Sequence, residues 1–279
     1  MTTLSELLRE ASAALEGIDT ATLDARLLVE HFTGTTRADA VSRPEQAVVP
    51  GAVAAVRAAL ARRAAGEPTH RIIGWREFYG LRLALSPDTL EPRPDTEALV
   101  DLVLPVLREV EGECRVLDLG TGTGAIALAL LSQLPQAIAL ATDIASGAVE
   151  QARRNAETLG LSARFAALRS DWFSAVDGRF HGIVSNPPYI SDKDFAALPR
   201  EVRDFDPHRA LKGGADGLDP YRILASGAAS HLEPAGVVAV EIGYDQLADV
   251  AGIFRQSGFT LRNVGKDLGG HDRALMFGR

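Results

Sequence analysis

From residue 114 onward, short apolar runs alternate with longer amphipathic segments, and this alternation constrains the fold more than any other feature. The apolar runs predict seven strands, at residues 115–119, 137–142, 163–168, 182–185, 237–242, 260–264 and 274–277. The amphipathic segments predict helices at residues 125–134, 146–159, 221–232 and 245–257. Such a chain builds an α/β fold, with a mostly parallel sheet covered by helices on both faces. A short loop containing Gly269-Gly270 joins the last two strands, so the final strand is expected to be antiparallel.

The chain ahead of this region has a different pattern. Residues 1–75 repeat apolar side chains at helical spacing, and they predict a small helical bundle with a loop at residues 44–51 and a third helix at 53–65. Residues 76–92 alternate around Gly80 and predict a hairpin linker. The third predicted part is residues 93–279. The bundle has no catalytic constellation, so it either docks a partner or only caps the larger domain.

Composition excludes several classes of protein. The net charge of −8 disfavours a nonspecific nucleic-acid binder, which usually has a basic surplus. The single cysteine, Cys114, allows no intrachain disulfide. The N-terminus lacks the basic and apolar regions of a signal peptide, and the longest apolar stretch, residues 125–141, is interrupted by polar residues and a proline. We therefore expect a cytoplasmic protein with no membrane association. The six histidines are scattered without ligand spacing, so no metal site is predicted.

A glycine-rich turn follows the first predicted strand of the sheet. It is Asp118-Leu119-Gly120-Thr121-Gly122-Thr123-Gly124, and its glycines allow a nucleotide to approach the backbone closely. Asp143 ends the next strand, where a carboxylate can bind two ribose hydroxyls, although it could also cap the following helix.

Two features of this turn disfavour a dinucleotide-binding oxidoreductase. The spacing is Gly-x-Gly-x-Gly rather than Gly-x-Gly-x-x-Gly. Asp118 also brings a negative charge near the loop, which suits a cationic cofactor better than a pyrophosphate. S-adenosylmethionine, with its sulfonium and amine, has that form.

Two further motifs follow later predicted strands. Ser170-Asp171-Trp172 offers an acid beside an aromatic ring, which can hold an adenine, although a Trp buried at a strand end is the simpler interpretation. Asn186-Pro187-Pro188-Tyr189 leaves its strand in an extended, rigid conformation, because each proline restricts both itself and the residue before it. The side chain of Asn186 and the carbonyls of Asn186 and Pro187 can then face a planar N–H donor, unless the motif is only a polar turn. All three motifs lie at carboxyl ends of strands, where open α/β sheets bind ligands.

Several segments together resemble the PrmC (HemK) family, the protein-glutamine N5-methyltransferases that modify peptide-chain release factors. The resemblance covers the hairpin linker and the larger domain. The segments are residues 77–81 (Glu-Phe-Tyr-Gly-Leu), 92–97 (Pro-Arg-Pro-Asp-Thr-Glu), 117–124, 171–173 (Asp-Trp-Phe), 184–190, 201–205 (Glu-Val-Arg-Asp-Phe) and 216–219 (Asp-Gly-Leu-Asp). Asn-Pro-Pro-Tyr alone also occurs in adenine-N6 DNA methyltransferases, whereas the segments at 92–97 and 201–205 are more specific. Glu91 departs from the aliphatic residue expected before Pro92.

The resemblance implies a seven-stranded, Rossmann-like class I methyltransferase with a small N-terminal helical domain that docks class I release factors. It implies S-adenosylmethionine as cofactor and the glutamine of the Gly-Gly-Gln loop as the methylated group. The cofactor residues would be Gly120, Thr121, Gly122, Thr123, Gly124, Asp143, Asp171, Trp172 and Asn186. The substrate residues would be Asn186, Pro187, Pro188 and Tyr189, with Asn186, Pro187 and Tyr189 acting in catalysis.

Residues 190–219 form a connection long enough to indicate a function, and we expect it to cover the bound peptide. Arg93, between two prolines, is expected to face a ligand unless its segment only caps the next helix. Two alternatives remain. One is an N6-adenine or other nucleic-acid methyltransferase, which the acidic balance disfavours. The other is a catalytically silent cofactor-binding translation partner, which the intact motifs disfavour.

Overall fold

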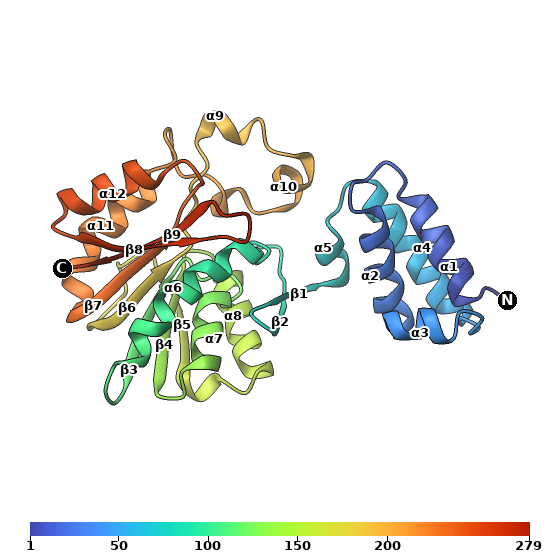
Figure 1. Cartoon of the computed structure of the whole chain (residues 1–279), viewed down its shortest axis with the longest axis horizontal. Coiled ribbons are helices and arrows are strands. Elements are labelled where there is room, and N and C mark those ends of the chain that lie inside the picture. Colours follow the sequence, from blue (N-terminus) through green and yellow to red (C-terminus); the bar gives the residue numbers. More distant parts are fainter. The chain divides into compact units, whose positions relative to one another are not determined.

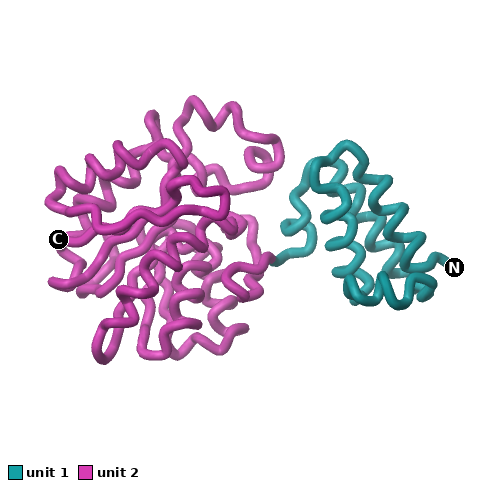
Figure 2. The backbone as a smooth tube through the Cα atoms, in the orientation of Figure 1, with its two compact units in different colours: residues 1–75 teal, residues 76–279 magenta.

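The computed structural model describes all residues, 1–279, and divides into two compact units (Figure 2). Unit 1 comprises residues 1–75 and unit 2 comprises residues 76–279. Each has its own buried core, which is the property that lets a segment of chain fold as a unit.

Unit 1 is a bundle of five helices (Figure 1). They are α1 (Leu4–Ala14), α2 (Ala21–Thr33), α3 (Arg37–Ser42), α4 (Pro50–Ala64) and α5 (Thr69–Ile73). The apolar stripe seen in the sequence forms its core, where Leu4, Leu7 and Leu28 are fully buried. One ion pair is also buried there, between Arg63 of α4 and Asp24 of α2, with an N–O distance of 2.8 Å.

A two-stranded hairpin opens unit 2, formed by β1 (Trp75–Phe78) and β2 (Leu81–Ala84). Its turn residues, Tyr79 and Gly80, both have positive φ, at 52° and 73°, as a two-residue hairpin turn of the primed type requires. That conformation is unfavourable for tyrosine, but the Tyr79 amide donates a 2.7 Å hydrogen bond to Glu97 and its hydroxyl donates one to Asp101. The hairpin is therefore held against the helix that follows.

A seven-stranded sheet forms the centre of unit 2, with strand order β5-β4-β3-β6-β7-β9-β8. The strands are β3 (Cys114–Leu119), β4 (Ala137–Asp143), β5 (Phe165–Arg169), β6 (Phe180–Ser185), β7 (Leu232–Glu241), β8 (Thr260–Lys266) and β9 (Asp272–Gly278). Strands β3 to β7 pair in parallel, and β9 is antiparallel to both of its neighbours, as predicted.

Helices cover both faces of this sheet (Figure 1). One face carries α6 (Glu97–Arg108), α7 (Ala125–Gln133) and α8 (Ser146–Thr158), and the other carries α11 (Asp219–His231) and α12 (Leu247–Gln256). Along β6, Val184 packs with the first layer and Ile183 with the second, because successive strand side chains point to opposite faces. A strand buried on both sides in this way has the continuous apolar sequence that predicted it.

The structure differs from the sequence-based expectations at several boundaries. The predicted loop at 44–51 ends early, because Pro50 occupies the first turn of α4, a position that suits a residue without an N–H. The helices α3 and α5 were not predicted, because each is too short for a periodic pattern. The connection at 190–219 contains the short helices α9 (Asp192–Phe195), α10 (Arg200–Phe205) and η3 (His208–Ala210). Two further 3-10 turns are η1 (Pro94–Thr96) and η2 (Ser162–Arg164).

No helix has both the length and the apolar character needed to cross a membrane.

Candidate active site at the carboxyl edge of the sheet

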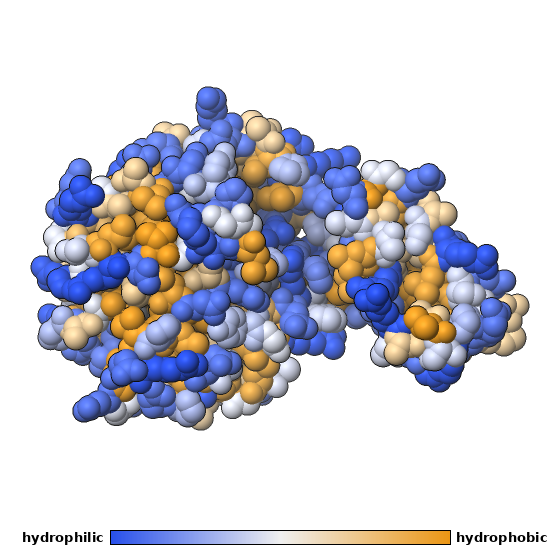
Figure 3. Space-filling view, viewed as in Figure 1, coloured by the Kyte–Doolittle hydropathy of each residue, from blue (hydrophilic) through white to orange (hydrophobic).

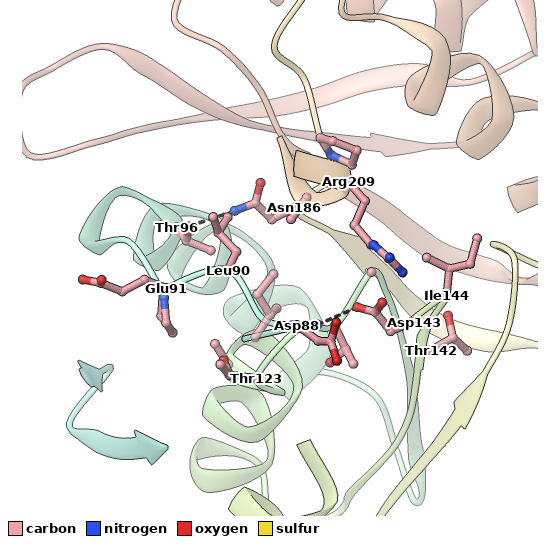
Figure 4. A pocket seen from close by; sticks show the side chains of 18 of the residues that line it. Asp88, Leu90, Glu91, Thr96, Thr123, Thr142, Asp143, Ile144, Asn186 and Arg209 are labelled. Atoms are coloured by element: carbon pink, nitrogen blue, oxygen red, sulfur yellow. Dashed lines mark hydrogen bonds between the residues drawn. The ribbon is translucent and has the colours of Figure 1, made fainter. Parts of the chain in front are cut away.

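A cavity of about 280 Å³ opens at the carboxyl ends of β3, β4, β5 and β6 (Figure 4). This edge is where parallel α/β sheets bind ligands, since the loops that leave neighbouring strands diverge there. The lining comes from the three sequence motifs and Asp143, from the segment before α6 and from the long connection. The lining residues include Asp88, Leu90, Arg93, Thr96, Gly120, Thr121, Gly122, Thr123, Asp143, Ile144, Ser170, Asp171, Trp172, Asn186, Pro188 and Arg209.

The glycine-rich turn between β3 and α7 forms one wall of the cavity. Gly120 and Gly122 have φ of +74° and +55°, and a Cβ built on either would meet no atom within 4 Å. The left-handed backbone therefore requires glycine here, and the space beside it is open to a ligand. Gly124 has a different role, because a Cβ there would lie 2.9 Å from the Leu128 side chain. It allows close packing and does not line the cavity.

Asp118 lies beneath this turn, fully buried at the end of β3. Its Oδ2 accepts a 2.7 Å hydrogen bond from the Thr121 hydroxyl and a 3.3 Å bond from the Ala127 amide, whereas Oδ1 has no protein partner. Burial raises the pKa of Asp118 to about 6. Asp118 therefore connects the glycine-rich turn to the start of α7 from beneath. It does not line the cavity.

Asp143 ends β4 and faces the cavity, with both carboxylate oxygens bonded to backbone amides. Oδ2 accepts from Gly122 at 3.0 Å and Oδ1 accepts from Ala145 at 2.9 Å. Burial raises its pKa, and these two hydrogen bonds and the nearby Arg209 guanidinium act in the opposite direction. Asp143 does not cap α8, whose N-cap is Ala145 without a side-chain bond. Each carboxylate oxygen keeps a further lone pair, so the group can still accept hydrogen bonds from a ligand.

The Ser170-Asp171-Trp172 segment follows β5 and turns sharply. Trp172 has a φ of 48°, a left-handed conformation that is uncommon for a residue other than glycine. The buried Ser170 hydroxyl stabilises it by donating to the Trp172 carbonyl at 2.7 Å and accepting from the Ala175 amide at 3.0 Å. Trp172 is only half-buried, so the turn brings both the indole and the exposed Asp171 to the cavity.

The Asn-Pro-Pro-Tyr segment leaves β6 beside the cavity. The Ser185 hydroxyl, just before it, bonds to the Leu119 carbonyl at 2.7 Å and joins the ends of β6 and β3. The Asn186 side chain donates through Nδ2 to the Thr96 hydroxyl at 3.1 Å (Figure 4). No protein group donates to the Asn186 Oδ1 or to the Pro187 carbonyl. These are the two acceptors that the sequence led us to expect.

Asn186 and Pro188 line the cavity, whereas Pro187 and Tyr189 do not. Pro187 is buried, and the Tyr189 hydroxyl points to Glu241 of β7, with an O–O distance of 3.4 Å. The segment is also held from behind. A Cβ on Gly213 would lie 2.7 Å from the Pro188 carbonyl oxygen, so only glycine allows the long connection to approach so closely.

The long connection is attached to the cavity at two points. Within it, the Ile190 amide donates to the Leu211 carbonyl at 2.9 Å. Arg93 donates a 2.7 Å hydrogen bond to the buried Asp206, and Arg209 lines the cavity near Asp143 (Figure 4). Arg93 thus lines the cavity, as expected, but its guanidinium is paired with the connection.

The residues of the motifs singled out in the sequence converge here, apart from Asp118, Leu119, Gly124, Pro187 and Tyr189, which do not line the cavity. Sequence reasoning missed Thr96, Asp88, Ile144 and Arg209. Thr96 lies within the Pro-Arg-Pro-Asp-Thr-Glu segment, and Ile144 directly follows Asp143, so position in a motif was a usable signal for both. Glu91, the departure noted above, is buried and ion-paired with Arg76.

Comparison with known proteins agrees with this architecture. Residues 96–202 match the family described as "Methyltransferase small domain". The crystal structure of a methyltransferase from Pyrococcus furiosus superimposes with a TM-score of 0.55 at 22% identity, covering 78% of this chain and 95% of that one. The fold and the cavity at its carboxyl edge define a class I methyltransferase.

The match of unit 1 to a known domain and the relatives that match nearly the whole chain show which family of methyltransferases this is. Residues 6–74 match the family described as "PrmC N-terminal domain". The release factor glutamine methyltransferase of Agrobacterium fabrum is 52% identical over 94% of this chain and 92% of its own length, and that of Rhodospirillum rubrum is 50% identical over 93% and 79%. The chain belongs to the release factor glutamine methyltransferase family.

Proposed function

We propose that this chain transfers a methyl group from S-adenosylmethionine to the side-chain amide nitrogen, N5, of the glutamine in the Gly-Gly-Gln motif of class I peptide-chain release factors. One observation carries the proposal. Asn186 lines the cavity and no protein group donates to its Oδ1, and the carbonyl of the next residue, the buried Pro187, is likewise without a protein donor. A primary amide has two N–H donors, which two such acceptors could bind.

The cavity has the groups that S-adenosylmethionine requires. Its open glycine backbone at Gly120 and Gly122 admits a nucleoside, and the Asp143 carboxylate can accept from two ribose hydroxyls. The Trp172 ring and the Asp171 carboxylate can hold an adenine by packing and by a hydrogen bond to its exocyclic amine. When bound, the cofactor supplies a methyl group on a positively charged sulfur.

The Asn-Pro-Pro-Tyr segment would orient the amide for attack. An amide nitrogen is a weak nucleophile, because its lone pair is delocalised into the carbonyl, so correct placement accounts for much of the rate. As the nitrogen forms its new bond it becomes more positive and its N–H groups become stronger donors. Asn186 and Pro187 therefore bind the transition state more tightly than the starting amide. Tyr189 would pack against the amide plane.

Unit 1 is proposed to dock the release factor. It exposes apolar side chains, with Leu23 at 47%, Val41 at 79% and Val49 at 68% exposure. In Figure 3, hydrophobic areas of the surface lie among hydrophilic ones. Replacing Val41 and Val49 by Asp should raise the KM for the release factor and leave methylation of a short Gly-Gly-Gln peptide unchanged. An unchanged KM for the whole factor would exclude docking through these side chains.

Mass spectrometry tests the main proposal directly. Release factor incubated with the enzyme and S-adenosylmethionine should gain one methyl group on the loop glutamine. A release factor with that glutamine replaced by Ala is the matched control and should gain none. Methyl transfer to adenine in DNA, run in parallel, would instead support the nucleic-acid alternative.

A further inference from the structure

Glu241, the last residue of β7, has a buried carboxylate that the mechanism above does not use. The residue is 2% exposed, and its Oε2 has no partner at hydrogen-bonding geometry. Burying a carboxylate costs several kcal/mol unless it is well paired, so such a group is retained at a cost to stability. Glu241 does not line the cavity.

Its neighbours connect it to the Asn-Pro-Pro-Tyr segment on two sides. The Tyr189 hydroxyl lies 3.4 Å from Oε1. The buried Thr96 hydroxyl also faces this carboxyl and opposes the rise in its pKa that burial causes, and the same hydroxyl accepts from the Asn186 Nδ2 at 3.1 Å. Glu241 therefore contacts one proposed catalytic side chain, Tyr189, directly and is separated from the other, Asn186, by Thr96.

The direction of these hydrogen bonds follows from the chemistry of the groups. An ionised carboxylate only accepts, so the single Thr96 proton must point toward Glu241. The Thr96 oxygen is then left to accept, and it selects the NH₂ end of the Asn186 amide. The Oδ1 end consequently faces away from Thr96, and no protein group donates to it. A neutral acid would free the Thr96 proton to bond Asn186 Oδ1, and both amide orientations would become possible.

We propose that Glu241 is a positioning residue, whose ionised carboxylate acts through Thr96 to keep the Asn186 Oδ1 turned toward the substrate amide and acts through the Tyr189 hydroxyl to hold the ring beside it. The inference rests on the proposed function, because it assigns a reason for the orientation of the same acceptor. It also explains why a carboxylate is buried in the core, where an apolar side chain would destabilise the folded state less.

Several charged and titratable groups face Glu241 and influence its pKa. Tyr189, Tyr221 of α11, Arg273 of β9 and Asp95 of η1 all face it. Burial raises the pKa of Glu241 to about 7, and burial likewise raises the pKa of both tyrosines above their ordinary value. The kcat of the wild-type enzyme should therefore fall as the pH is lowered through about 7.

The Glu241→Gln variant tests the proposal. We expect kcat to fall about 10- to 100-fold, as for a misplaced catalytic group, with the KM for S-adenosylmethionine unchanged and the activity loss near pH 7 abolished. Thr96→Val should lower kcat in the same way, and Thr96→Ser, which keeps the hydroxyl, should restore it.

Two results would overturn the inference. One is a Glu241→Gln enzyme that keeps the wild-type pH profile and kcat. The other is a loss of kcat accompanied by an equal rise in the cofactor KM and a lower unfolding midpoint, which would indicate only a structural role. Failure of the proposed function is distinct, because the wild-type enzyme itself would then leave the loop glutamine unmethylated.

Discussion

The guanidinium of Arg93 donates a 2.7 Å hydrogen bond to the carboxylate of Asp206, a residue 113 positions later in the chain. The Asp206 side chain is 1% exposed, whereas that of Arg93 is 37% exposed. This contact joins the segment before α6 to the long connection, at the cavity that Arg93 and Arg209 both line. It shows how a rigid Pro-Arg-Pro segment and a long connection with three short helices become parts of one site.

We expect Arg93→Ala to raise the KM for S-adenosylmethionine about 10-fold, because it removes the guanidinium that pairs with the buried Asp206 carboxylate and loosens the connection. Steady-state kinetics with varied cofactor would measure this. Arg200→Ala is the matched control, since it removes an exposed pair with Asp204 on α10. Equal effects of the two variants would contradict the assigned role of the Arg93–Asp206 pair.

Asp143→Asn should weaken cofactor binding by about 10- to 100-fold, the range expected for hydrogen bonds to a charged group. The variant keeps the side-chain shape, but it replaces one acceptor by a donor opposite the Gly122 or Ala145 amide. Isothermal titration calorimetry would give the affinity. The exposed Asp177→Asn should bind as the wild type does, and normal affinity of Asp143→Asn would argue against ribose binding at this carboxylate.

Asn186→Ala should lower kcat by about 10²- to 10³-fold, the usual effect of removing one group that stabilises developing charge. Cofactor affinity should change little if the main contacts of the cofactor are the glycine turn and Asp143. Single-turnover methylation of release factor would separate chemistry from binding. Full activity of this variant would remove the acceptor pair from the mechanism.

Arg203→Glu should raise the KM for the release factor more than the KM for the cofactor. Arg203 lies on α10 of the connection, paired with the adjacent Asp204 at 3.1 Å, and it does not line the cavity. Reversing its charge should therefore disturb a peptide that the connection covers without reaching the nucleoside. Kinetics with each substrate varied in turn would decide, and an unchanged release factor KM would place the peptide elsewhere.

Glu241→Gln should stabilise unit 2 at pH 8 by about 2 kcal/mol while impairing activity. The folded-state pKa of Glu241 is raised from 4.5 to about 7, so the folded protein binds more protons than the unfolded chain between these values. Its contribution to stability is therefore most favourable below about pH 4.5 and is lost as the pH rises through 7. Urea unfolding at pH 5 and pH 8, followed by tryptophan fluorescence, should show the variant gaining only at the higher pH. A destabilised variant at pH 8 would mean that the carboxylate is paired more strongly than its contacts indicate.

Local patterns in the sequence determined the elements and the position of each motif along them. Strand residues such as Ile183 and Val184 are apolar because both faces of β6 are covered, and this periodicity is visible without any partner. The glycine turn, Asp143, Trp172 and Asn186 each lie at the end of a strand or within three residues of it, so their meeting at one edge could be predicted from a parallel sheet alone.

Tertiary structure alone decided which distant residues contact the residues of the candidate site. The strand order places β7 beside β6, and this brings Glu241 behind Tyr189 and Thr96, which are 52 and 145 residues away in sequence. Arg93 and Asp206 meet only because the connection folds back over the cavity. Periodicity and turn chemistry act over a few residues, whereas these contacts depend on how complete elements pack, so no local pattern records them.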